Sequence, residues 1–106
     1  MNCYNGIMDY ISPNKNKLEE VCKKNLVEFL GVFGSVARGE YTKDSDVDVL
    51  VRFSPRAKIG YFKLYEIEQE IARSLGKKID LVTQDALSPY IKDRVYSDLK
   101  PIYGQP

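Results

Sequence analysis

Residues 34–51 read GSVARGEYTKDSDVDVLV and contain a Gly-Ser turn, a polar stretch and two aspartates that lead into an apolar run. The aspartates, Asp46 and Asp48, are one residue apart. In an extended chain alternate side chains share a face, so we expect both carboxylates to point the same way, about 7 Å apart along the backbone. Unpaired carboxylates repel each other, whereas Mg²⁺ prefers oxygen ligands and bridges carboxylates to substrate phosphates. The pattern therefore predicts a site for a metal-bound phosphate.

Three short segments have the composition of strands. Residues 26–33 (LVEFLGVF) are rich in β-branched and aromatic residues, and the predicted strand ends at the Gly34 turn. Residues 47–53 (VDVLVRF) are apolar enough for a central strand, which the following Ser-Pro pair ends. Residues 78–83 (KIDLVT) predict a third strand.

A short helical turn and a polar loop are expected between the first two strands. Ser35 is predicted to be the N-cap of a helical turn that runs to about Arg38 and is closed by Gly39. Residues 40–45 follow as a polar loop.

Helical periodicity marks three further segments. Residues 14–25 carry apolar side chains at i, i+3 and i+4, and residues 60–75 carry a longer stripe that ends at Gly76, a plausible C-terminal cap. Residues 88–99 predict a last helix, broken by Pro101, and residues 102–104 form a packed or frayed tail. The buried stripes are Leu18, Val21 and Cys22 in the first helix and Leu64, Ile67, Ile71 and Leu75 in the second.

This alternation of strands and helices predicts an α/β (α+β) fold, with a small mixed β-sheet of three or more strands flanked by helices. At 106 residues the chain is expected to form a single domain, residues 1–106. Apolar residues make up 43% of the chain and charged residues 29%, which is ordinary globular composition.

Composition also limits the chemistry and the setting. The sequence has no histidine, which excludes Ser-His-Asp and Cys-His machinery and every His-ligated metal site. Cys3 and Cys22 are too few for a disulfide framework or a zinc cluster. We find neither a signal-peptide pattern nor an apolar run long enough to span a bilayer, and the net charge of +1 gives no field that would attract nucleic acid or an anionic membrane. We therefore expect a cytoplasmic protein that binds neither membrane nor nucleic acid directly.

A third carboxylate lies within the last predicted strand. Asp80 stands between Ile79 and Leu81, where an uncompensated charge in a buried strand would cost several kcal/mol, so we expect a cation to meet it. If this strand lies beside residues 47–53, then Asp46, Asp48 and Asp80 form a cluster that can hold two Mg²⁺ about 3.5–4 Å apart. The Gly-Ser turn would offer backbone N–H groups and a hydroxyl to a phosphate. These parts together favour phosphoryl or nucleotidyl transfer.

The order G-S-x-A-x-G, S-D-x-D and a later lone Asp resembles the DNA polymerase β-like nucleotidyltransferase superfamily. The chain is similar over nearly its whole length to the smallest members, the minimal nucleotidyltransferases. By this resemblance Gly34 and Ser35 hold the triphosphate and Asp46 and Asp48 hold both metals. Asp80 then holds one metal and is the general base toward an incoming hydroxyl.

The resemblance also implies a partner and a reaction. Minimal nucleotidyltransferases of this kind are often encoded beside a HEPN-domain ribonuclease toxin and act as its antitoxin, transferring AMP from ATP to a toxin tyrosine. The chain departs from the commonest family pattern at Val36 and Val49, and neither change removes a metal ligand or a phosphate donor.

Several other side chains have two interpretations each. Arg38 is either a bidentate phosphate ligand or a surface ion-pair partner. Tyr41 can stack on adenine, Lys43 is interpreted as a solvated loop charge, and Asp85 is the alternative to Asp80 as a ligand. The tyrosines at helical positions are expected in the core or an interface; they are Tyr61, Tyr65, Tyr90 and Tyr96. The interspersed basic residues are expected to be ordinary surface charge rather than a binding patch; they are Arg52, Arg56, Lys58, Arg73, Lys77 and Lys78.

Two rival functions stay open at this point. The first is a binding module that neutralises a toxin by covering its active site without nucleotide transfer. The second is a small-molecule or RNA nucleotidyltransferase whose substrate-binding half comes from a second polypeptide. A homo- or hetero-oligomer is possible whichever function holds, and the helices at residues 60–75 and 88–99 each offer a docking surface.

Overall fold

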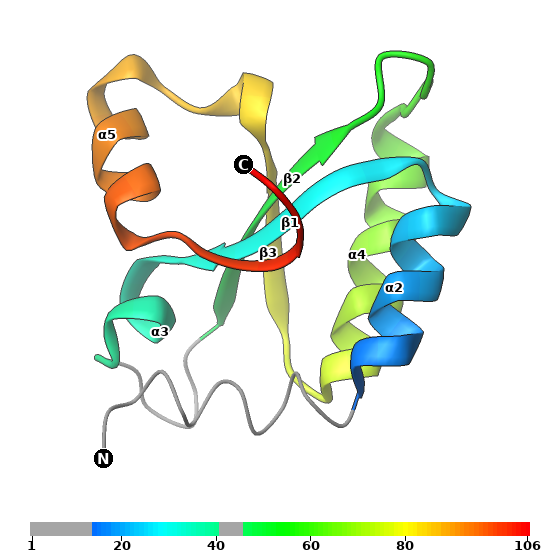
Figure 1. Cartoon of the computed structure of the whole chain (residues 1–106), viewed down its shortest axis with the longest axis horizontal. Helices are drawn as coiled ribbons and strands as arrows, with labels where there is room; N and C mark the ends of the chain where they lie inside the picture. Colours follow the sequence, from blue (N-terminus) through cyan, green and yellow to red (C-terminus); the bar gives the residue numbers. More distant parts are fainter. Residues whose placement is uncertain (1–13, 41–45) are drawn as a thin grey trace.

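The computed structural model describes residues 14–40 and 46–106. Within them the strands form one four-stranded sheet in the order β3-β2-β1-β4, flanked by helices (Figure 1). This confirms the predicted mixed sheet with helices around it. In chain order the elements are α2 (Lys15–Lys24), β1 (Val27–Phe33), α3 (Gly34–Arg38), β2 (Val47–Phe53), α4 (Tyr61–Leu75), β3 (Ile79–Thr83), the 3₁₀ turn η2 (Gln84–Ala86), α5 (Pro89–Asp98) and β4 (Lys100–Gly104).

The sheet is mixed because its connections differ in length. β1 is antiparallel to β2 and to β4, and β2 is parallel to β3. A parallel neighbour needs a crossover, which here is α4, between β2 and β3. In the order β3-β2-β1-β4 the two central strands are β2 and β1. This confirms the central position predicted for residues 47–53.

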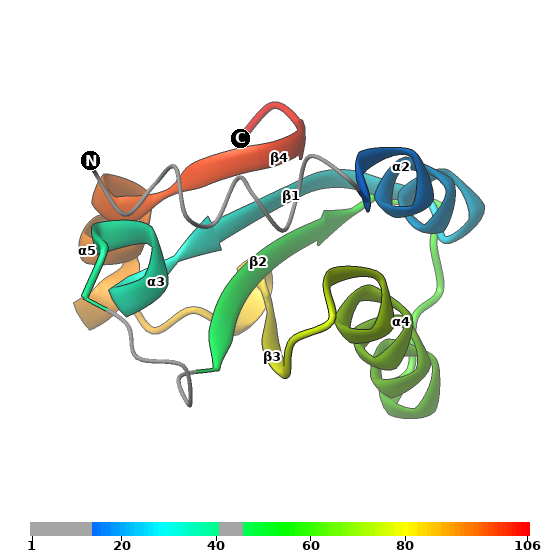
Figure 2. The same cartoon turned by 90° about the horizontal axis from the view of Figure 1, so that it is seen from below.

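The two faces of the sheet are covered by different helices. Alternate residues of β2 point to opposite faces, so Val47, Val49 and Val51 join a core with α2 and α4. Leu50 points the other way and packs with Phe29 and with Val95 of α5. Figure 2 shows α2 and α4 together, away from α5. The buried residues of α3, Val36 and Ala37, belong to the core with α2 and α4. The predicted stripes of α2 and α4 are confirmed: Leu18, Val21, Cys22, Ile67, Ile71 and Leu75 are buried, and Leu64 is partly buried against them.

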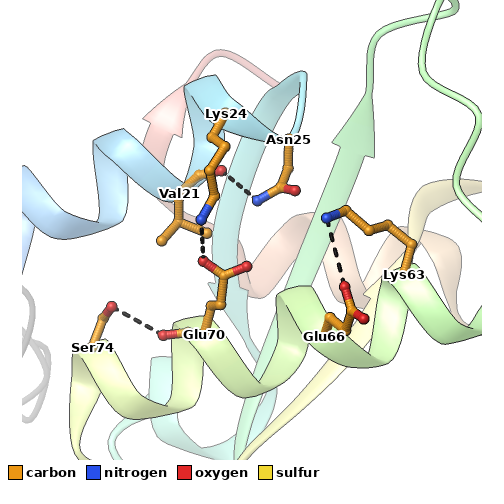
Figure 3. A network of polar contacts seen from close by, with 7 residues as sticks. All are labelled: Val21, Lys24, Asn25, Lys63, Glu66, Glu70 and Ser74. Atoms are coloured by element: carbon orange, nitrogen blue, oxygen red, sulfur yellow. Dashed lines mark hydrogen bonds and ion pairs between the residues drawn. The ribbon is translucent and has the colours of Figure 1, made fainter.

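Polar contacts join α2 to α4 at the surface (Figure 3). Lys24 Nζ lies 2.7 Å from Glu70 Oε2, and the Lys24 side chain is 63% exposed. The Asn25 side-chain amide is buried and donates to the Val21 carbonyl at 2.8 Å, which satisfies a carbonyl at the end of α2. Exposed ion pairs contribute about 0–1 kcal/mol, so the apolar stripes, not this pair, hold the two helices together.

The ends of α4 and α5 match the expected signals. Gly76 has φ +67° and donates its N–H to the Ala72 carbonyl at 2.9 Å, which closes α4. Ser88 precedes Pro89 and its hydroxyl accepts the Tyr90 N–H at 3.2 Å, which caps α5.

Three details differ from the sequence predictions. Leu26 has φ +57°, which is not extended backbone, so β1 begins at Val27 rather than at residue 26. Gly34 turns the chain at φ +76° and begins α3, so Ser35 lies within the first turn and is not the N-cap. The C-terminal tail is packed, which was one of the two predicted alternatives, but it packs as a strand that the sequence did not predict, because residues 100–104 form β4 along β1.

Candidate active site

The candidate carboxylates gather where β2 and β3 begin. In the parallel register Asp48 of β2 lies directly beside Asp80 of β3, and neighbouring strands are about 4.8 Å apart, so both side chains share one face of the sheet. The pairing extends back along the chain, since the Val47 N–H donates to the Lys78 carbonyl at 3.0 Å. Asp46 stands immediately before β2 and is exposed. The predicted adjacency of the second and third strands is therefore confirmed.

Gly34, the residue that follows the neighbouring strand β1, lies against Asp48. Phe33, the last residue of β1, pairs with Asp48 across the antiparallel ladder, and Gly34 follows it. A Cβ atom at Gly34 would run into Asp48 Oδ2, and the φ of +76° is one that L side chains rarely adopt. Two independent features therefore require glycine at this position: the left-handed backbone of the turn and the Asp48 carboxylate that occupies the space of a Cβ atom.

The charges of Asp80 and Asp46 both act on Asp48. The pKa of Asp48 is raised above its ordinary value, chiefly by burial and then by the negative charges of Asp80 and Asp46. The positive charge of Arg38 acts in the opposite direction. Like charges held together in this way favour a cation between them.

The donor set fits a hard divalent cation. All three side chains supply carboxylate oxygens, which Mg²⁺ prefers, and the Asp48 carboxylate lies against the Gly34 turn. In the part of the chain that the structure describes, no three acidic or cysteine side chains are already closed around a metal position.

Arg38 forms the ion pairs that were one of its two predicted roles, and its role as a phosphate ligand stays a prediction. Its Nε lies 2.6 Å from Glu40 Oε2 and its Nη1 lies 2.6 Å from Asp98 Oδ2, so it forms the ion pairs that the sequence left as one possibility. These carboxylates raise the pKa of the guanidinium further. Sequence reasoning missed Asp98, because nothing in the sequence links a residue of α5 to one sixty positions earlier.

Two predictions about aspartates are corrected. Asp80 is exposed on β3, an edge strand of the sheet, so the expected burial of its charge is wrong, whereas its role as a metal ligand stays a prediction. Asp85 lies in η2, beyond the far end of β3 from Asp80, about 15 Å away by strand geometry. Asp85 is therefore not an alternative ligand of the same site.

Three of the four helical tyrosines lie outside the core. Tyr61, Tyr65 and Tyr90 are 92%, 62% and 97% exposed, which excludes the core and leaves an interface as the predicted place for them. Tyr96 packs partly buried beside the cluster of Phe29 and Leu50. Tyr41 and Lys43, whose roles the sequence also raised, lie outside the described residues.

A cavity of about 400 Å³ opens elsewhere, at the carboxyl ends of β2 and β3. Its lining includes Arg52, Thr83 and Asp85 but none of the three clustered aspartates. The chemistry-bearing side chains are at the opposite ends of these strands, so we do not place the site in this cavity.

Comparison with known proteins supplies the family. Residues 15–102 match the family described as nucleotidyltransferase domain. The chain belongs to this family. The protein adenylyltransferase MntA of Thermococcus cleftensis is 38% identical over 93 residues, which are 88% of this chain and 89% of that protein. In the described ranges, no helix of this nucleotidyltransferase is long and apolar enough to cross a membrane.

Solved structures share the fold of this nucleotidyltransferase. A structure provisionally described as a minimal nucleotidyltransferase has a TM-score of 0.72 at 26% identity, covering 95% of this chain and 96% of that one. A Shewanella oneidensis complex of a tri-AMPylated HEPN toxin with its MNT antitoxin has a TM-score of 0.64 at 22% identity, covering 89% of this chain and 72% of that one. Nucleotidyltransferases act on a nucleotide and usually need a divalent metal.

Proposed function

We propose that this nucleotidyltransferase is a Mg²⁺-dependent protein adenylyltransferase and the antitoxin of a cognate HEPN ribonuclease toxin, transferring AMP from ATP to a toxin tyrosine. The observation that carries the proposal is the side-by-side placement of Asp48 and Asp80 with Gly34 against Asp48. The name of the Thermococcus cleftensis relative supports transfer to protein, and the Shewanella oneidensis complex supports a HEPN toxin as the partner.

Each candidate residue has a separate role in this proposal. Asp46 and Asp48 hold two Mg²⁺ ions, and Asp80 holds one of them. Bound metal supplies charge stabilisation to the phosphates and to the leaving group. Gly34 and Ser35 present first-turn N–H groups and a hydroxyl to the triphosphate, and Arg38 donates to a phosphate.

The reaction is an in-line substitution at the α-phosphorus of ATP. The toxin tyrosine oxygen forms a bond to the α-phosphorus, the bond from that phosphorus to the bridging oxygen breaks, and pyrophosphate leaves. Asp80 takes the phenolic proton as general base. Its exposure suits this role, because the acceptor arrives from another protein and must reach the carboxylate from outside.

The setting follows from the partner. A ribonuclease toxin acts where RNA and ATP are present, so we propose that the protein works in the cytoplasm. Its own net charge of +1 gives no reason to expect direct binding to nucleic acid.

The test is the intact mass of a co-expressed HEPN partner before and after incubation with this protein, ATP and Mg²⁺. We expect an increase by one or more AMP groups. Asp46→Asn and Asp80→Asn should each reduce transfer by at least about 10²-fold, because each removes charge stabilisation from the transition state. Asp85→Asn is the matched control and should transfer normally, since Asp85 lies at the far end of β3.

Three other results would contradict the proposal. A stable complex without added mass would mean that the protein neutralises its toxin sterically. Label that passes to RNA or to a small molecule, and not to protein, would identify a different acceptor. If Asp46→Asn or Asp80→Asn transferred AMP at the wild-type rate, the assignment of that residue as a metal ligand would be wrong.

A further inference from the structure

Arg38 connects the candidate site to a helix far away in the sequence. It ends α3, four residues after Gly34, which places it one helical turn from the glycine. Its Nη1 lies 2.6 Å from Asp98 Oδ2 at the end of α5, and its Nε lies 2.6 Å from Glu40 Oε2. The guanidinium is therefore held from two directions, by its own loop and by another element.

The two carboxylates that hold Arg38 are not equivalent. The Asp98 side chain is 14% exposed, whereas the Glu40 side chain is 63% exposed. Asp98 is also fixed in place by its neighbours, because Val95 of α5 is buried against Phe29 and Leu99 packs on the same cluster. Exposed ion pairs contribute little to stability or geometry, so Asp98 is the carboxylate that sets the position of the guanidinium.

That position suits a phosphate bound in front of the Gly34 turn. Arg38 ends the same short helix that begins at Gly34, and Gly34 lies against the Asp48 carboxylate. A guanidinium has five N–H donors, so it can keep both carboxylate contacts and still donate to a phosphate. An unrestrained arginine loses rotamer freedom when it binds a ligand, and a side chain that is already held loses less.

We propose that Asp98 is a positioning residue for the nucleotide: it holds the Arg38 guanidinium where it meets the triphosphate that the Gly34-Ser35 turn receives. The inference rests on the proposed function, since it concerns the same nucleotide. Asp98 acts only through Arg38 and does not contact ATP. It follows that α5, which supplies none of the predicted ligands, is part of the nucleotide site.

The test is a double-mutant cycle on nucleotide affinity, measured by calorimetry with AMP-PNP and Mg²⁺. We expect Asp98→Asn to raise the Kd about tenfold, the usual size of the effect when the partner of a binding residue is lost. Arg38→Ala should raise the Kd by at least as much. The Asp98→Asn, Arg38→Ala double variant should bind no more weakly than Arg38→Ala alone, because Asp98 has nothing left to position.

Glu40→Gln is the matched control for the cycle. It removes the other carboxylate from the same guanidinium, and we expect its Kd to change by less than about twofold because Glu40 is exposed. Thermal unfolding of every variant, with affinity measured well below each Tm, separates binding from folding.

The outcomes that overturn the inference differ from those that overturn the function. If wild type binds AMP-PNP and Asp98→Asn binds equally well while its Tm falls, Asp98 only fastens α5 to α3 and the inference is wrong, but the proposed function stands. Additive losses in the double variant would also overturn it, because Asp98 would then act independently of Arg38. A wild-type protein that does not bind AMP-PNP would overturn both.

Discussion

The Cα of Gly34 lies against the carboxylate of Asp48, so the turn after β1 and the second residue of β2 fix each other. The antiparallel ladder brings them together, because Phe33 is the register partner of Asp48 and Gly34 comes next. One backbone position therefore determines where the phosphate turn lies relative to the most buried of the three aspartates.

Replacing Gly34 with alanine should disrupt both the fold and the site. The left-handed backbone, with φ +76°, costs about 1–2 kcal/mol for a residue with a Cβ atom. The new Cβ would also push the Asp48 carboxylate away, and a displacement of about 1 Å can cost about 10²-fold in rate. Urea denaturation and the rate of AMP transfer measure the two effects.

Gly76→Ala is the matched control for Gly34→Ala. Gly76 has a similar φ of +67°, but a Cβ there meets nothing within 4 Å. It should lose about 1–2 kcal/mol of stability and keep its transfer rate. If Gly34→Ala also kept the wild-type rate, contact between Gly34 and Asp48 would have no part in catalysis.

Asp48→Asn should make the metal-free protein more stable while it abolishes transfer. The pKa of Asp48 in the folded state is raised above its ordinary value of 3.8, by burial first and then by Asp80 and Asp46. The folded state thus binds the proton more tightly than the unfolded state, and stability falls as pH rises through that range. Asparagine carries no charge at any pH. The gain in free energy of unfolding of Asp48→Asn over wild type should therefore be absent below about pH 3.8 and should grow as pH rises.

Denaturation of wild type and Asp48→Asn between pH 3 and 8, in the presence of a chelator, measures this difference. Adding Mg²⁺ and ATP should then stabilise wild type, by about 2.7 kcal/mol at a hundredfold excess over Kd, and should not stabilise the variant. If Asp48→Asn were less stable than wild type at neutral pH without metal, the Asp48 charge would not destabilise the folded protein.

The central elements could be predicted because each has its own local signal. Val47 and its alternate neighbours mark a strand by composition, and the 3.6-residue stripe of Ile67, Ile71 and Leu75 marks a helix. The adjacency of Asp48 and Asp80 followed from placing two predicted strands side by side, which the parallel register confirms.

Other features depend on contacts that the sequence does not display. Asp98 becomes important only because α5 packs beside α3, and the exposure of Asp80 follows from the place of β3 at the edge of the sheet. The tail residues Lys100–Gly104 have a proline and a glycine, which read as irregular chain, yet the free edge of β1 makes them a strand. Each of these features depends on packing between segments that are far apart in the sequence.

The Cys22 thiol should be unreactive in the folded protein. Its side chain is fully buried in α2, and burial, followed by the charge of Glu19, raises its pKa from 9.0 to about 12. Because the thiolate is the reactive form, a Cys3→Ser variant should react with Ellman's reagent at pH 8 only after it unfolds. Fast reaction of the native variant would mean that α2 opens readily.

The same thiol should make stability fall in alkali. Its folded pKa lies above its unfolded pKa, so its contribution is fully present below about pH 9 and is lost as pH rises toward 12. Cys22→Ala should reduce this dependence, at the cost of a small cavity, and denaturation at pH 8 and pH 10 compares the two proteins. An unchanged slope in Cys22→Ala would assign the loss to other groups.

Gly104→Ala should detach the C-terminal strand. Gly104 has φ +72° and pairs with Phe29, and a Cβ at Gly104 would strike the backbone carbonyl of Glu28, which cannot move without breaking β1. We expect a loss of at least about 2 kcal/mol, from backbone strain and the lost pairing together. Gly60→Ala is the control, since Gly60 has ordinary backbone and nothing within 4 Å of its Cβ position, and should change stability little. Equal stability of the two variants would show that β4 adds nothing to the sheet.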